Sequence, residues 1–229
     1  HNPKVAIQAA ESGYVEMILF SINPAFDMLP ASEDADMMFA EEYAAGLKGI
    51  DADRAKLYRV CEQNDVGITV MKCFAGGRLF DAKRSPFGVS LTPVQCIHYA
   101  LTRPAASAIL CGYDTREQVD QALAYEGASD TEKDYASVLS NAPFHSYRGE
   151  CTYCGHCKPC VAQLDIAMIN KFYDLATMQP EVPATVQSHY EALEHTASEC
   201  IGCRACESRC PFGVKIAERM KKTAKLFGR

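Results

Sequence analysis

The sequence predicts an α/β fold for its first part and an all-helical arrangement for its second. Helix patterns alternate with short apolar segments over roughly the first two thirds of the chain, which favours parallel strands joined by right-handed crossovers. These segments are apolar nearly throughout, as expected for a sheet covered on both faces. From Gly149 onward the strand pattern stops, and closely spaced cysteines and helix patterns replace it. We therefore expect two domains, residues 1–145 and 146–229.

The expected elements of the first part follow from capping residues and apolar runs. Asn2 followed by Pro3 marks the start of a helix that Gly13 ends. Further helix starts are expected at Asp51, at Thr92, at Thr115 and at the capping box Ser129-x-x-Glu132. The expected strands are residues 16–22 (EMILFSI), 67–72 (GITVMK) and 107–112 (SAILCG). The acidic stretch 23–49 is expected to be a loop with a short helix.

Three strands leave both edges of the sheet open, and open edges expose unpaired backbone groups. Either the chain holds part of a barrel, or other segments cover those edges. The second part has helix patterns at residues 165–178, 185–195 and 214–226 and no strand pattern.

Eight of the twelve cysteines form two runs near the C-terminus. The second run has the spacing Cys-x2-Cys-x2-Cys-x3-Cys-Pro, in which the fourth cysteine of a two-cluster ferredoxin ligates the other [4Fe–4S] cluster. Two runs therefore predict two clusters with crossed ligands, and we expect each fourth cysteine at the start of a helix. The expected ligand sets are Cys151, Cys154, Cys157 with Cys210, and Cys200, Cys203, Cys206 with Cys160.

Other uses of these cysteines fit the spacing less well. Zinc sites usually pair two Cys-x2-Cys hairpins across about 15–20 residues, whereas each run here holds three cysteines at two-residue intervals. Disulfide frameworks belong to small secreted domains with weak cores. The remaining cysteines lie in apolar surroundings and are expected to be small buried hydrophobic residues: Cys61, Cys73, Cys96 and Cys111.

Composition restricts the partners. The net charge of −6 and the isoelectric point near 5.5 argue against nucleic acid. No apolar run reaches the ~18 residues that a membrane span needs, and we expect a cytoplasmic protein. The C-terminal segment is basic, and it either docks an acidic redox partner protein or complements the dipole of its helix. Its cations are Lys215, Arg219, Lys221, Lys222, Lys225 and Arg229.

Four strings point to a known family: HNPKVAIQAAESG, FSINPAFD, VGITVMKCFAGGRLF and AILCGYDTREQVDQAL. They resemble the second half of an aldo/keto reductase barrel, and most closely the bacterial branch whose barrel is followed by a two-cluster ferredoxin-type domain. The resemblance covers essentially the whole chain. It implies the C-terminal part of a (β/α)8 barrel, about three parallel strands with helices, before an all-helical two-cluster domain.

The resemblance also implies NAD(P) bound across the carboxyl ends of the strands, where barrel active sites lie, and a small-molecule substrate. A glycine pair and a lysine at a strand end suit a phosphate. The implied cofactor-binding residues are Asn2, Ser21, Asn23, Met71, Lys72, Gly76, Gly77, Gly112, Tyr113, Arg116 and Gln118, with Asp114 in the same loop.

No catalytic residue is assigned. By the resemblance, the family's catalytic tyrosine, lysine, aspartate and histidine come from the first half of the barrel, so this chain by itself should not reduce carbonyls. His1 matches a loop position instead.

The leading expectation is an iron–sulfur oxidoreductase whose clusters relay single electrons to or from a barrel-bound redox cofactor. Nicotinamide moves a hydride, so coupling to clusters needs a two-electron to one-electron converter such as a flavin, and the sequence shows no flavin motif. The alternative is a non-enzymatic electron carrier or interaction module that uses the clusters.

Overall fold

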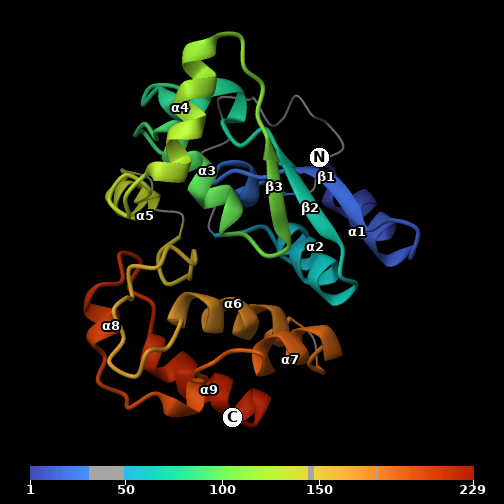
Figure 1. The fold of residues 1–229 in the computed structure, drawn as a ribbon, viewed down its shortest axis with the longest axis vertical. Coiled ribbons are helices and arrows are strands. Elements are labelled where there is room, and N and C mark those ends of the chain that lie inside the picture. Colours follow the sequence, from blue (N-terminus) through green and yellow to red (C-terminus); the bar gives the residue numbers. More distant parts are fainter. Residues whose placement is uncertain (31–48, 144–146, 179) are drawn as a thin grey trace.

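The computed structural model describes residues 1–30, 49–143, 147–178 and 180–229 (Figure 1). Most of the acidic stretch lies outside these residues. Three parallel strands form one sheet in the order β1-β2-β3: β1 (Met17–Ser21), β2 (Gly67–Met71) and β3 (Ala106–Leu110). The expected α/β class with a parallel sheet is confirmed.

Three capped helices, one before each strand, pack on one face of the sheet: α1 (Pro3–Glu11), α2 (Ala52–Gln63) and α3 (Pro93–Leu101). Side chains of Asn2, Asp51 and Thr92 each accept a hydrogen bond from a backbone N–H in the first turn, as their N-cap positions predict. Phe20, Ile68 and Val70 point to this face and are fully buried. The helices therefore cover one side of the sheet with a close-packed core.

The opposite face differs from expectation. Met17 and Leu19 of β1 are 52% and 51% exposed, and Leu110 of β3 is 59% exposed. Alternate residues of a strand point to opposite faces, so these apolar side chains share the face away from the helices. A sheet covered on both sides was expected from its apolar strands, whereas the residues that the structure describes cover only one.

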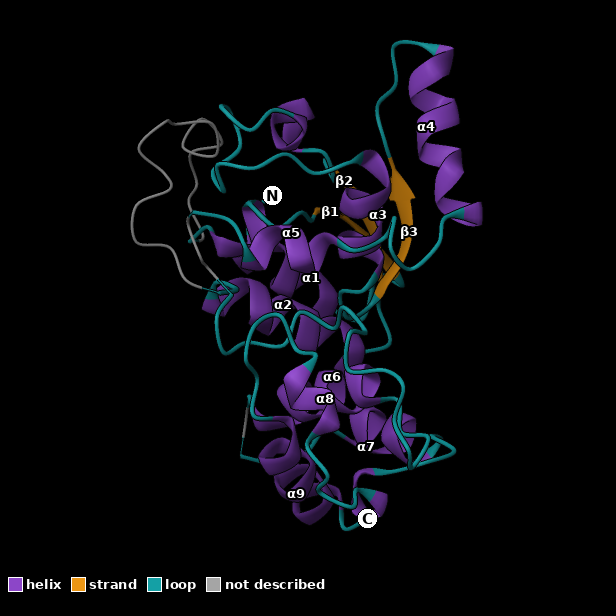
Figure 2. Cartoon of the chain, turned by 90° about the vertical axis from the view of Figure 1, so that its left-hand side faces the viewer, coloured by secondary structure: helices purple, strands orange, loops and turns teal. Residues whose placement is uncertain are grey.

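Two more helices follow the sheet. Helix α4 (Arg116–Gly127) follows β3 along the chain (Figure 2). It packs on α3 and buries no residue fully. Ser129 and Glu132 make the expected capping-box bonds, but these close a turn and not a helix. Helix α5 (Tyr135–Ser140) begins later because Asp134 supplies its N-cap, accepting from the backbone N–H of Ser137 at 2.8 Å.

From Ile166 on, the described residues form helices and no strand. The elements are α6 (Ile166–Thr177), α7 (Ala184–Glu191), the 3-10 helix η5 (Ala197–Glu199), α8 (Ala205–Ser208) and α9 (Ile216–Phe227). Helix α7 ends four residues before the expected His195, because Thr196 and Glu199 form a second capping box that turns the chain. No helix among the described residues is long and apolar enough to cross a membrane.

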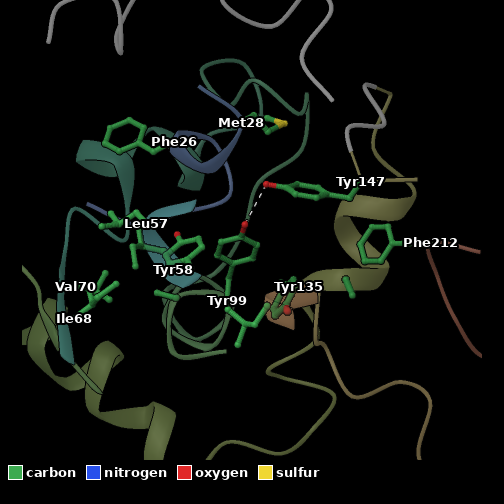
Figure 3. Close-up of a cluster of buried hydrophobic side chains, with 14 of the residues drawn as sticks. Phe26, Met28, Leu57, Tyr58, Ile68, Val70, Tyr99, Tyr135, Tyr147 and Phe212 are labelled. Atoms are coloured by element: carbon green, nitrogen blue, oxygen red, sulfur yellow. Dashed lines mark hydrogen bonds between the residues drawn. The ribbon is translucent and has the colours of Figure 1, made fainter. Parts of the chain in front are cut away.

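The buried hydroxyls of Tyr99 and Tyr147 meet where the two parts join (Figure 3). The hydroxyl of Tyr99 in α3 donates to Asp27 at 2.8 Å and lies 3.1 Å from the hydroxyl of Tyr147, which donates to the carbonyl of Pro24 at 2.7 Å. All four groups are buried. The predicted boundary at residue 145 falls among residues that the structure does not describe, and it stays a prediction.

Candidate cluster-binding and cofactor sites

The two cysteine runs adopt the same local backbone pattern. In each run, the residue before the second cysteine and the residue after it have positive φ: Tyr153 (58°) and Gly155 (83°), then Gly202 (70°) and Arg204 (60°). Alternating left-handed residues turn successive backbone N–H groups toward one concave side, a nest that binds anions and occurs at many Fe–S sites. Both runs are therefore shaped for an anionic group.

Left-handed backbone explains where the glycines lie. A Cβ built at Gly155 or Gly202 would meet no atom within 4 Å, so space does not require glycine there. The positive φ favours glycine at these positions, because this backbone conformation costs other residues roughly 1–2 kcal/mol. Tyr153 and Arg204 accept that cost at the matching positions, which shows that the loop shape is held by the surrounding structure.

Two small cavities separate the eight cysteines into two groups of four. Cys151, Cys154 and Cys157 line one, of about 20 Å³, together with Cys210 of the other run. The second cavity, of about 30 Å³, is lined by Cys200, Cys203, Cys206 and by Cys160 of the first run. These groups coincide with the crossed ligand sets expected from spacing, and ligation itself stays a prediction.

The spacing of the cysteine side chains differs from that of a single-ion site. A tetrahedral zinc holds each sulfur at about 2.3 Å, which brings the four sulfurs to within about 4 Å of one another. Among the residues that the structure describes, no three His, Cys, Asp or Glu side chains are grouped so that they could hold one metal ion. A [4Fe–4S] cube instead spreads its four ligands over separate iron corners.

The fourth cysteines do not begin helices, contrary to expectation. Cys160 and Cys210 lie in turns ahead of α6 and α9, closed by hydrogen bonds from Gln163 N at 3.0 Å and Gly213 N at 3.2 Å to their carbonyls. Helix α6 begins only where Asp165 can cap it, its carboxylate accepting from Met168 N at 3.1 Å. The capping residue thus decides the helix start.

A buried polar side chain borders the first cavity, and a half-buried arginine joins the two runs. Asn170 of α6 is 1% exposed, lines the first cavity, and neither its amide nitrogen nor its oxygen has a hydrogen-bond partner. Arg209 donates to the carbonyls of Cys157 at 2.6 Å and Pro159 at 2.7 Å, which ties the second run to the first. Neither contact was anticipated from the sequence.

Ionisation in the first run depends on burial and on one histidine. Burial raises the pKa of Cys151, and that of Cys157 to about 12, so positive iron would have to hold them as thiolates. The Cys154 sulfur and the Asp134 carboxylate raise the pKa of His156 to about 9. Nε2 of His156 lies 3.0 Å from Asp134, which fixes the ring beside the loop.

A separate, larger cavity of about 700 Å³ opens at the carboxyl ends of β2 and β3. Gly76 and Gly77 border it within the 3-10 segment η4 (Ala75–Phe80), with φ of 63° and 78°. Seven of the residues implied as cofactor-binding line this cavity: Met71, Lys72, Gly76, Gly77, Gly112, Tyr113 and Gln118.

The other four implied residues do not line that cavity. Asn2 caps α1, and Arg116 has a 90% exposed side chain, 3.8 Å from Asp120. Ser21 and Asn23 are buried: Ser21 Oγ lies 3.0 Å from His1 Nδ1, and Asn23 donates to the carbonyl of Lys72 at 2.8 Å. The structure gives these four residues local structural contacts, and cofactor binding by them stays a prediction.

One feature of the large cavity was missed from the sequence. Cys73 and Cys111, which were expected to be separate buried hydrophobic residues, place their Sγ atoms 3.1 Å apart on its wall. The signal was present, because Cys73 directly follows the predicted strand 67–72, Cys111 lies near the end of the predicted strand 107–112, and these two strands are consecutive along the chain.

In the comparison with known proteins, one segment of the chain matches a known family. Residues 194–215 match the family model of the 4Fe-4S binding domain, a range that contains the whole second cysteine run and none of the first. Neither the search of curated proteins nor that of solved structures returned a match. The chain therefore contains a ferredoxin-type iron–sulfur domain, which gives it the capacity for electron transfer.

Proposed function

We propose that this protein is an electron-transfer protein that holds two [4Fe–4S] clusters with crossed ligands. The observation that carries the proposal is the pair of cavities, each bordered by three cysteines of one run and the last cysteine of the other. If each run bound its own cluster, its fourth cysteine would line the same cavity as its first three. The proposed ligands are thus all eight cysteines of the two runs.

Three further observations support two clusters. The first run repeats the left-handed positions of the second run, which alone matches the family model. The described cysteines form no single-ion group. Asn170 carries two unsatisfied polar atoms at the first cavity, and buried polar atoms normally have partners, so its amide fits a cluster sulfur there.

The surface of α9 supplies a docking face for an acidic redox partner protein. Five cations near the C-terminus are exposed: Lys215, Lys221, Lys222, Lys225 and Arg229. The sixth cation of that segment, Arg219, is paired with Asp174 and packs over the ring of Tyr173. Five cations, and not the six counted in the sequence, are therefore available to dock a partner.

For the first part we propose a segment of an aldo/keto reductase-type barrel. The exposed apolar side chains of Met17, Leu19 and Leu110 lie on one face of the sheet, the face that further strands would enclose in a barrel. The 700 Å³ cavity at the strand ends favours a second candidate function, binding of NAD(P) beside a small-molecule substrate. Lys72 and the paired glycines would then meet a phosphate.

Metal analysis tests the cluster proposal. Protein purified without oxygen should contain about eight iron and eight acid-labile sulfide per chain and absorb broadly in the visible range. A variant Cys61→Ser, altered in α2, should keep the full iron content and serves as the control. Zinc without sulfide, or about four iron, would contradict the two-cluster proposal.

Calorimetric titration with NADPH tests the cofactor candidate. Lys72→Met should weaken binding about tenfold by removing one charged contact worth roughly 1.5 kcal/mol. The exposed Lys83→Met should leave binding unchanged. No heat of binding to the wild-type chain would remove NAD(P) from this site.

A further inference from the structure

The thiols of Cys73 and Cys111 meet where two neighbouring strands end. Met71 of β2 is paired with Leu110 of β3, so the chain that follows each strand enters the same wall of the 700 Å³ cavity. The two Sγ atoms lie 3.1 Å apart, and neither cysteine belongs to the cluster runs. Among the described residues, no other two cysteine sulfurs lie within hydrogen-bond distance of each other.

We propose that Cys73 and Cys111 form a redox-active dithiol that exchanges with low-molecular-weight disulfides entering this cavity. The site is separate from the clusters, so it goes beyond the electron-transfer function and does not depend on it.

The two thiols have different acidities. The hydrogen bond with Cys73 lowers the pKa of Cys111, against the opposing effect of burial. The same contact, together with burial, raises the pKa of Cys73 far above its usual value. Thiolates and not thiols are nucleophiles, so Cys111 is the attacking residue and Cys73 keeps its proton.

The exposure of the two cysteines also favours Cys111 as the attacking residue. Both cysteines line the cavity, but Cys111 is half-buried whereas Cys73 is only 1% exposed. A small disulfide therefore meets Cys111 first. This arrangement of an accessible nucleophile beside a shielded second thiol is the one that thiol–disulfide exchange requires.

The exchange balances in two steps. The Cys111 thiolate attacks one sulfur of RS–SR, forming Cys111–S–S–R and releasing RS⁻. Cys73 then attacks the Cys111 sulfur, forming the Cys73–Cys111 disulfide and displacing the second RS⁻. The proton of Cys73 passes to a leaving thiolate, and two electrons move from the protein dithiol to the small disulfide.

Forming the bond requires little movement. A disulfide has an S–S distance of about 2.05 Å, roughly 1 Å shorter than the present separation. Gly112 follows Cys111 directly, and a Cβ built there would meet no atom within 4 Å, so the loop has room to adjust.

Cys96 provides a matched control. It lies in the same part of the chain within α3, is fully buried, does not line the cavity, and burial raises its pKa. It should not react with a small disulfide, although its sulfur is chemically identical.

The experiment treats the wild-type holoprotein with oxidised glutathione at pH 7.5, blocks remaining thiols with iodoacetamide, and maps disulfides by mass spectrometry. Trypsin places Cys73 in residues 73–78 and Cys111 in residues 85–116, and fragmentation separates Cys111 from Cys96. We expect a Cys73–Cys111 link. Cys73→Ser should accumulate the glutathione adduct on Cys111, and Cys111→Ser should lower the rate of glutathione release at least tenfold. Cys96→Ala should behave as wild type.

The Cys73–Cys111 link is sought in unmutated protein, so this test does not depend on whether any variant folds. Absence of that link, or glutathione on Cys96 as fast as on Cys111, would overturn the proposal. Iron measured before and after treatment keeps the two proposals apart: a protein without iron that still forms the link contradicts only the clusters, and an intact two-cluster protein without the link contradicts only the dithiol.

Discussion

The guanidinium of Arg103, at the end of α3, donates a hydrogen bond to the carbonyl of Thr152, the residue after the first cysteine of the first run. The hydroxyl of Tyr135 donates to the same oxygen at 2.6 Å. The Arg103 group also lies over the ring of Tyr153, 4.9 Å from its centre. The sheet-containing part thereby holds the first cysteine loop in position.

Replacing this anchor should loosen the first loop. Arg103→Met should lower the free energy of unfolding by about 1–3 kcal/mol, because the buried carbonyls of Tyr99 and Thr152 each lose a charged donor. Arg116→Met, at an exposed position on α4, should change it by less than about 0.5 kcal/mol. Thermal unfolding followed by circular dichroism measures both. Equal losses in the two variants would contradict an anchoring role.

Paired substitutions test the crossed ligands. If serine at a ligand position removes a cluster, Cys151→Ser with Cys210→Ser should leave about four iron per chain, because both changes affect one cluster. Cys200→Ser with Cys210→Ser should remove nearly all iron, because each change affects a different cluster. The reverse pattern would mean that each run binds its own cluster.

Asn170 should tune the first cluster. Hydrogen bonds to cluster sulfurs stabilise the reduced, more negative state and raise the reduction potential. Asn170→Leu keeps the volume and removes the donor, so it should lower one potential by about 20–60 mV, equivalent to roughly 0.5–1.5 kcal/mol. Square-wave voltammetry should show the other potential unchanged.

Asn141→Leu is the matched control for that substitution. Asn141 is exposed at the end of α5, where its amide donates to Ser137 O at 2.8 Å. Both potentials should stay as in the wild type. A shift of the same size in both variants would show that the effect is not specific to the cavity.

His98 should make stability depend on pH. Burial lowers its pKa below the usual value, and nearby Lys133 and Arg103 act in the same direction against Asp130. The unfolded chain therefore binds a proton at higher pH than the folded chain, so the free energy of unfolding falls as pH drops below about 6.5.

The comparison with His98→Gln isolates this contribution. The midpoint of thermal unfolding should drop more between pH 7.5 and pH 5.5 in the wild type than in the variant, since other titrating groups contribute equally to both. Identical drops would mean that His98 is protonated as readily when folded.

Capping residues and strand patterns were reliable guides to the fold because both act over a few neighbouring residues. Asn2, Asp51, Thr92 and Thr115 all cap the helices expected from them. The Ser129 box failed as a helix start, although its hydrogen bonds formed, because Asp134 offered a cap nearer the apolar residues of α5. Local sequence patterns therefore locate the helices and strands well, but they do not decide which of two nearby capping residues begins a helix.

The sequence by itself determined which three cysteines of each run lie together, since their spacing keeps them on one short loop. Only the tertiary structure decided the contacts between distant residues. Arg103 reaches Thr152, Asn170 reaches the first cavity, and Cys73 meets Cys111 because helix packing and strand register bring them together. No local pattern encodes such contacts, because they depend on the path of the intervening chain.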